Sequence, residues 1–165
     1  MNELIENHLE GDEGALNGRF LTFQVGKETF GIEIRYVVEI VGLQQVTEMP
    51  EMPEYIIGII DLRGKIVPVM DVRLRFKLPV KDYDDRTSII IIEMNGTTIG
   101  LVIDNVAEVV RIGDDQILKK PEMGSDDNCG YVKKIGRIDD QIVLLIDSEK
   151  LLTYDECSQI KERKL

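Results

Sequence analysis

Polar and apolar residues alternate in two similar pairs of short segments. The first pair covers 21–25 and 30–34, and the second covers 89–94 and 98–103. A period of two is typical of strands with one buried face, so each segment is predicted to be a β-strand. Short turns join the members of each pair, and the second turn is Asn95-Gly96, a dipeptide that accepts positive φ at both positions. Two β-hairpins are therefore expected.

After each hairpin the apolar spacing changes to three or four residues. The residues concerned are Val37, Ile40 and Val41 after the first hairpin, and Val106, Val109 and Val110 after the second. This spacing predicts a single helical turn or an irregular crossover at each place, leading into another strand.

Prolines and glycines divide the rest of the chain. Residues 48–54 contain two prolines and are predicted to be an extended connector. A third hairpin is expected over 56–62 and 66–70, turned at Arg63-Gly64, with Pro68 restricting its second strand to an edge or irregular position. Residues 77–85 are predicted to be a linker. A short C-terminal helix is expected over 148–165, with Ser148 as a candidate N-cap.

The chain contains an internal repeat. Shifted by 69 residues, Gly31 falls on Gly100 and the segments around them align without a gap; shifted by 76, Ile66-Val67-Pro68-Val69-Met70-Asp71 falls on Ile142-Val143-Leu144-Leu145-Ile146-Asp147. Many short strands in two similar modules predict two small β-barrels packed against each other, SH3-like and five-stranded, with an OB-like pair as the alternative. The expected organisation is an acidic tail over 1–18, barrel subdomains over about 19–80 and 86–147, intertwined or in tandem, and a C-terminal segment.

Composition narrows the possible partners. The 165 residues carry a net charge of −11, with 31 acidic against 20 basic residues, and aromatic residues make up 5%. Nucleic-acid binding needs basic residues and usually stacking aromatics, so this balance argues against a nucleic-acid or oligosaccharide barrel. Cys129 and Cys157 are expected to be ordinary reduced thiols. With neither a signal peptide nor a long apolar run, the sequence predicts a cytoplasmic protein without direct membrane insertion.

Candidate enzyme chemistry is sparse. His8 is the only histidine and falls in the predicted tail, so an internal histidine base beside a serine or cysteine is lacking. Paired acids occur at 84–85, 114–115, 126–127 and 139–140, each in a predicted turn or linker and without the ligand pattern of a calcium loop. Neither a catalytic residue, a metal nor a cofactor is predicted. A metal or small-ligand site built from the acidic turns is kept as the alternative, and it requires those acids to converge on one cleft.

Two groups of residues are candidates for an interaction surface. Arg63 is either an exposed turn residue or a fixed guanidinium that binds carboxylates or carbonyls at an interface. Val37-Val38-Glu39-Ile40 lies where the strand periodicity breaks, and is either core or part of the seam between the barrels. Glu39 and its repeat mate Glu108 could equally be solvated surface residues.

The sequence from about Arg19 to Leu152 resembles the CheW family of chemotaxis coupling proteins. The resemblance rests on the pattern from Phe23 to Ile40, on Thr47 to Pro50, and on Gly58 to Asp71, which contains Leu62-Arg63-Gly64. It implies two SH3-like barrels about a common hydrophobic centre. The family commonly has asparagine before Leu-Arg-Gly, where this chain has Asp61.

The resemblance also implies a function. The chain would be a non-enzymatic adaptor that joins methyl-accepting chemoreceptors to the histidine kinase CheA and is recruited to membrane-associated receptor arrays. The tip of the receptor's helical hairpin would dock in the groove between the barrels, near Val37, Glu39, Ile40, Gly58 and Arg63. The residues that contact CheA are not fixed by the sequence.

Overall fold

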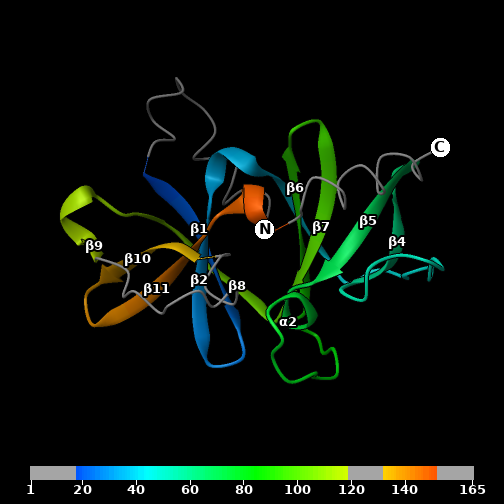
Figure 1. The fold of residues 1–165 in the computed structure, drawn as a ribbon, viewed down its shortest axis with the longest axis horizontal. Coiled ribbons are helices and arrows are strands. Elements are labelled where there is room, and N and C mark those ends of the chain that lie inside the picture. Colours follow the sequence, from blue (N-terminus) through cyan, green and yellow to red (C-terminus); the bar gives the residue numbers. More distant parts are fainter. Residues whose placement is uncertain (1–17, 119–131, 152–165) are drawn as a thin grey trace.

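The computed structural model describes residues 18–118 and 132–151 (Figure 1). Its elements are β1 (Arg19–Val25), β2 (Glu28–Glu33), the 3₁₀ turn η2 (Ile34–Tyr36), β3 (Val37–Gly42), β4 (Ile56–Leu62), β5 (Lys65–Asp71), α2 (Val72–Arg75), β6 (Ser88–Met94), β7 (Thr97–Ile103), β8 (Asn105–Arg111), η3 (Asp114–Gln116), β9 (Ile117–Leu118), β10 (Val132–Ile138), β11 (Gln141–Ile146) and η5 (Ser148–Lys150). Most of the expected acidic tail and C-terminal helix lies outside the described residues. Within these residues, none of the helices has the length and apolar character to cross a membrane.

The strands form two sheets that lie side by side (Figure 1). Barrel A has the strand order β8-β1-β2-β11-β10-β9, and barrel B has the order β3-β6-β7-β5-β4. Each sheet therefore combines the first hairpin of one repeat with the later strands of the other. The contiguous halves 19–80 and 86–147 do not coincide with the barrels. In each repeat, the chain crosses from one sheet to the other after the first hairpin.

Strand pairing shows the repeat directly. Gly31 lies opposite Thr22 in β1 and Leu145 in β11, whereas Gly100 lies opposite Ile91 in β6 and Val69 in β5. These partners are related by the two shifts found in the sequence, 69 and 76. Ile66 and Ile142 also match, opposite Asp61 and Arg137 respectively. The predicted equivalence of Gly31 with Gly100 and of Ile66 with Ile142 is confirmed.

Apolar side chains gather in three clusters. The largest lies between the sheets and takes residues from both, among them Phe23, Ile32, Ile90 and Ile103. A second cluster fills barrel B and a third fills barrel A. The run 89–92 is apolar throughout because both faces of β6 are buried: Ile89 and Ile91 face the barrel B cluster, and Ile90 and Ile92 face the central one. The structure thus has the shared hydrophobic centre that the resemblance implied.

Of the two alternatives predicted at 37–41 and 106–110, the helical turn is wrong, because both segments are strands that contain a β-bulge. The chain does cross from one sheet to the other before each of them. Val37 lies opposite Ile92, but Glu39 already lies opposite Ile91, so Val38 is an extra residue. Because of this extra residue, the inward-facing side chains of Val37 and Ile40 are three positions apart in the sequence, a spacing that also occurs in helices. The register of β1 with β8 shifts in the same way between Leu21 and Phe23.

Two local expectations have different outcomes. β5 lies inside its sheet, between β4 and β7, but its pairing with β7 begins only at Val69. Pro68 therefore pairs with β4 alone, which agrees with the predicted edge-like position. Ser148 is not the N-cap of the segment that follows β11. Asp147 takes that role, because its Oδ1 accepts a hydrogen bond from the backbone N–H of Glu149 at 3.1 Å.

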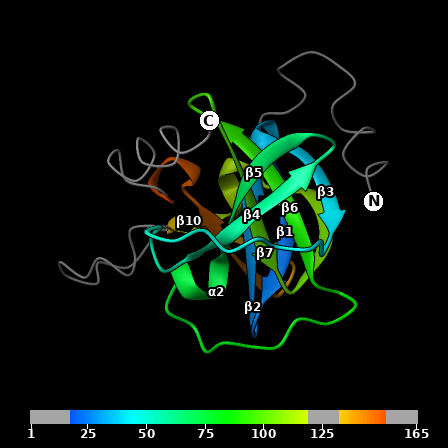
Figure 2. The same cartoon turned by 90° about the vertical axis from the view of Figure 1, so that its right-hand side faces the viewer.

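Arg73 joins three separate parts of the chain. It lies in α2, and its guanidinium binds both carboxylate oxygens of Asp104, at the corner between β7 and β8. It also donates to the carbonyl of Pro79 in the linker at 2.7 Å. Burial alone would raise the pKa of the Asp104 carboxyl, but hydrogen bonds from Arg73 and from the Gly26 N–H outweigh this and lower that pKa. The linker, a long loop at the α2 end of the molecule, is thereby fixed to both repeats (Figure 2).

Asp104→Asn is expected to lower the free energy of unfolding at pH 7 by about 2 kcal/mol, because a charged hydrogen-bond acceptor is lost. Since the folded pKa of Asp104 is depressed, its contribution is present above the ordinary value of about 3.9 and is lost as the pH falls through the folded pKa. Urea unfolding at pH 7 and pH 3 should therefore show a difference between wild type and variant that shrinks in acid. Asp82→Asn, at an exposed linker position, is the control. An equal difference at both pH values would contradict the assignment.

Candidate functional site

Arg63 occupies the tip of the hairpin formed by β4 and β5. Its φ is 54° and that of Gly64 is 87°, and positive φ at both central residues is the type I′ geometry favoured in two-residue hairpins. Asp61 Oδ1 accepts a hydrogen bond from the Gly64 N–H at 2.8 Å. An asparagine oxygen could accept the same bond, so Asp61 keeps the turn and adds a negative charge. The turn leaves the Arg63 side chain 70% exposed.

The guanidinium of Arg63 forms an ion pair with Glu39 Oε2. Its hydrogen bond to Glu39, and then the charge of that carboxylate, raise the pKa of Arg63 above its usual value. Glu39 belongs to β3, and Arg63 directly follows β4. These are the two edge strands of the barrel B sheet. The pair therefore joins two edges that lie at opposite ends of the strand order.

Glu39 itself is largely covered. Its side chain is 14% exposed, and Oε1 is buried without a hydrogen-bond partner in the part of the chain that the structure describes. A buried acceptor without a donor costs free energy, so such an atom in a folded protein calls for an explanation. The Arg63–Glu39 pair is thus exposed on the arginine side and incompletely satisfied on the glutamate side.

Gly58 lets the connector between β3 and β4 close the barrel. Thr47 and Ile59 exchange two backbone hydrogen bonds of 2.8 Å, which attach this connector to β4. A Cβ on Gly58 would lie 2.2 Å from the carbonyl oxygen of Thr47. Gly58 also has a φ of 154°, which side-chain-bearing residues rarely adopt. Its role in the structure is the close approach of two backbones.

The five residues singled out from the sequence separate into two groups. Glu39, Gly58 and Arg63 lie on the edges of barrel B, whereas Val37 and Ile40 are buried in the central cluster. Val37 and Ile40 therefore hold β3 in place, and their side chains expose little surface to a partner. The exposed apolar side chains of this region are Val38, 46% exposed, and Leu43, 40% exposed. Val38 falls within the segment 37–40 that the sequence nominated, but the apparent helical spacing hid which of its side chains are exposed, and Leu43 was not nominated.

Among the described residues of barrel A, the positions equivalent to Glu39 and Arg63 do not form an ion pair. Shifted by 69, Glu39 corresponds to Glu108, and shifted by 76, Arg63 corresponds to Asp139, which like Arg63 has a positive φ, 53°. Two acidic residues thus stand where barrel B has opposite charges. The two barrels share a backbone plan but differ at this edge.

Other candidate chemistry does not assemble in the described residues. The acidic pairs at 84–85, 114–115 and 139–140 lie in the linker, in η3 and in the turn between β10 and β11, and the pair at 126–127 lies outside the described part. Groups of three or more metal-ligating side chains are not found in the regions that the structure describes. The convergence required by the acidic-turn alternative is not seen among these pairs.

Comparisons with known proteins agree with this architecture. The sequence model of the CheW-like domain matches residues 19–156. The chain is similar to chemotaxis protein CheW of Klebsiella aerogenes, with 35% identity over 86% of this chain and 85% of that protein, and to CheW of Helicobacter pylori, with 32% identity over 83% and 82% respectively.

A solved structure shows the same fold. The crystal structure of scaffolding protein TtCheW from Thermoanaerobacter tengcongensis superposes with a TM-score of 0.76 at 34% identity, covering 84% of this chain and 94% of that one. The two-barrel, mainly β architecture, the internal repeat and these similarities lead to one assignment. The chain belongs to the CheW family of chemotaxis scaffold proteins, which are not enzymes.

Proposed function

We propose that this chain acts as an adaptor that couples methyl-accepting chemoreceptors to the histidine kinase CheA. The observation that supports a receptor site best is the exposed Arg63 guanidinium held by Glu39 across the edges of barrel B. A planar guanidinium in a fixed position suits recognition of carboxylates or carbonyls on a partner. Family membership supports a chemotaxis role, and the site suggests where one partner binds.

The receptor surface proposed here combines charged and apolar groups. Val38 and Leu43 supply exposed apolar side chains, and Arg63 with Glu39 supplies a charged rim. An amphipathic helix that lays its apolar face in a groove uses this combination. Val37, Ile40 and Gly58 take part by fixing the position of these groups.

CheA is proposed to bind one barrel through packing against its own related domain, while the receptor occupies the surface at β3 and the hairpin of β4 and β5. Both barrels offer an exposed apolar residue at the repeat-related positions Ile66 and Ile142, 42% and 41% exposed. Two such barrels can contact different partners at the same time. Binding of this kind would recruit the chain to receptor arrays at the membrane.

A titration tests the adaptor function. The protein is added to a fixed mixture of CheA and a receptor cytoplasmic fragment, and complex size and kinase output are followed. A bridging protein gives a ternary complex that saturates, and a large excess then separates the partners because each binds its own copy. Strictly competitive binding of CheA and receptor, or catalytic turnover by this chain alone, would contradict the proposal.

A further inference from the structure

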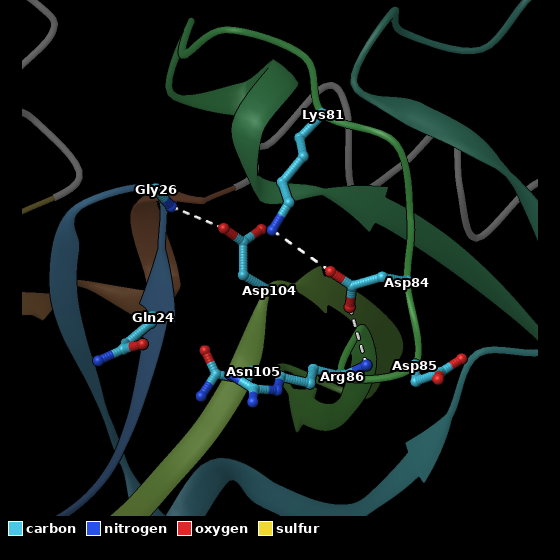
Figure 3. Close-up of a pocket in the computed structure, with 8 residues that line it drawn as sticks. All are labelled: Gln24, Gly26, Lys81, Asp84, Asp85, Arg86, Asp104 and Asn105. Carbon is cyan, nitrogen blue, oxygen red and sulfur yellow. Dashed lines mark hydrogen bonds and ion pairs between the residues drawn. The ribbon is translucent and has the colours of Figure 1, made fainter.

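A polar pocket of about 460 Å³ lies beside the linker, where it passes the corner between β7 and β8 (Figure 3). Its lining comes from both repeats and from the linker that joins them: Gln24, Gly26, Lys81, Asp84, Asp85, Arg86, Asp104 and Asn105. None of these residues belongs to the surface proposed for the receptor. The pocket is therefore a separate feature of the molecule.

The acidic groups of the pocket already have partners or face elsewhere. Asp104 is held by Arg73 and by the Gly26 N–H at 2.8 Å, and Asp84 accepts from the Arg86 N–H at 2.8 Å. That backbone hydrogen bond is the main reason why the pKa of Asp84 is lowered. The side chain of Asp85 points away from the other lining residues (Figure 3). Acceptor capacity inside the pocket is largely used.

Donor capacity in the pocket is only partly used, since Lys81 pairs with Asp84 and its charge also helps to lower the pKa of Asp104. Lys81 Nζ has three donors, and its ion pair with Asp84 is 3.5 Å long, beyond an ordinary hydrogen bond. The guanidinium of Arg86 makes neither a hydrogen bond nor an ion pair within the described residues, and it extends toward the carboxamide of Asn105 (Figure 3). Two cationic donors thus face the same space.

The charges of the pocket favour a monoanion. Lys81, Arg86 and the neighbouring Arg73 balance the three aspartates, so the pocket is close to neutral on a chain of net charge −11. One carboxylate can bind two cationic donors there, whereas a phosphate dianion would bring twice the charge toward Asp84 and Asp104. The carboxamides of Asn105 and its strand partner Gln24 each offer both a donor and an acceptor, as peptide groups require.

We infer that this pocket binds an acidic peptide segment of a partner protein. The carboxylate of an aspartate or glutamate binds Arg86 and Lys81, and the flanking peptide groups bind Asn105 and Gln24. A volume of about 460 Å³ is within the usual range for a small-ligand site and has room for a few residues rather than a folded surface. The inference goes beyond the adaptor function and does not depend on it.

The test is an NMR titration of the ¹⁵N-labelled full chain with the peptide acetyl-Gly-Glu-Gly-amide, and separately with acetyl-Gly-Gln-Gly-amide, acetate and inorganic phosphate. Saturable shifts of the backbone amides of Gly26, Arg86 and Asn105 are expected with the glutamate peptide. Arg86→Gln and Lys81→Gln should each weaken binding about tenfold, because each removes hydrogen bonds to a charged group. Arg137→Gln, at an exposed position on β10, should bind like wild type.

Several outcomes would overturn the inference. They are the absence of saturable shifts, equal binding of the glutamine peptide, equal loss in Arg137→Gln, or unchanged affinity in Arg86→Gln. Acetate binding as tightly as the peptide would remove the role of Asn105 and Gln24, and tighter binding of phosphate would make the pocket a phosphate site. Thermal unfolding of Arg86→Gln and Lys81→Gln at wild-type temperature ensures that weaker binding reflects the pocket and not the fold.

Discussion

Replacing Gly58 by alanine is expected to lower the free energy of unfolding by about 3 kcal/mol, since it adds steric overlap to backbone strain. The new Cβ would lie 2.2 Å from the Thr47 carbonyl oxygen, and this contact is with backbone and cannot be relieved by a rotamer change. Moving Thr47 away breaks the two hydrogen bonds that it exchanges with Ile59. The connector between β3 and β4 would then detach from barrel B.

A series of glycine variants separates the contributions. Gly42→Ala has open space around its Cβ and should change stability by less than about 0.5 kcal/mol. Gly64→Ala also has open space but keeps a φ of 87°, and should cost about 1 kcal/mol. Urea unfolding of the three variants measures the differences. A Gly58→Ala protein as stable as Gly42→Ala would show that the close approach to Thr47 is unimportant.

Replacing Arg63 by glutamate is expected to weaken binding of the receptor fragment about a hundredfold, and replacing it by alanine about tenfold. Alanine removes charge-assisted hydrogen bonds, whereas glutamate also sets two like charges against each other at Glu39. Arg63 is 70% exposed, so the barrel should remain folded, but the largely covered Glu39 loses its ion-pair partner and some loss of stability is expected. Binding is measured by titration calorimetry with the receptor fragment, and folding by thermal unfolding.

Two further variants control this experiment. Arg137→Glu makes the same charge change at another exposed arginine and should leave receptor binding unchanged. The double variant Glu39→Arg, Arg63→Glu restores an ion pair between the edges but not a guanidinium at the hairpin tip, so its stability should recover while its affinity stays low. Wild-type affinity in a folded Arg63→Glu protein would remove Arg63 from the receptor site.

The sequence by itself determined the modular plan of this protein. Hairpin signals such as Asn95-Gly96 and the shifts of 69 and 76 can be read along the chain, so the hairpin strands, their turns and the equivalence of Gly31 with Gly100 could be predicted. The motif around Arg63 also sufficed to indicate the family. These properties depend on residues that are close together in the chain, so they can be recognised from the amino-acid sequence alone.

The tertiary structure alone decided how the modules combine. Strand exchange places β1 and β2 in one sheet with the later strands of the other repeat. The pattern of apolar residues does not predict this, because pairing within a repeat and pairing between repeats would bury the same apolar faces. The bulge at Val38 likewise depends on the register with β6, which turned an apparent helical spacing into a strand and placed Val37 and Ile40 in the core.

The ion pair and the pocket follow from the same cause. Glu39 meets Arg63 only because the two edges of barrel B approach each other, and Arg86 and Asn105 line one pocket only because the linker is fixed by Arg73 across two repeats. The residues of each site are far apart in the sequence, and their meeting depends on the whole sheet arrangement. Contacts between residues distant in the sequence leave no periodic signal. The sequence could therefore nominate Glu39 and Arg63 but not their pairing, and it did not indicate the pocket.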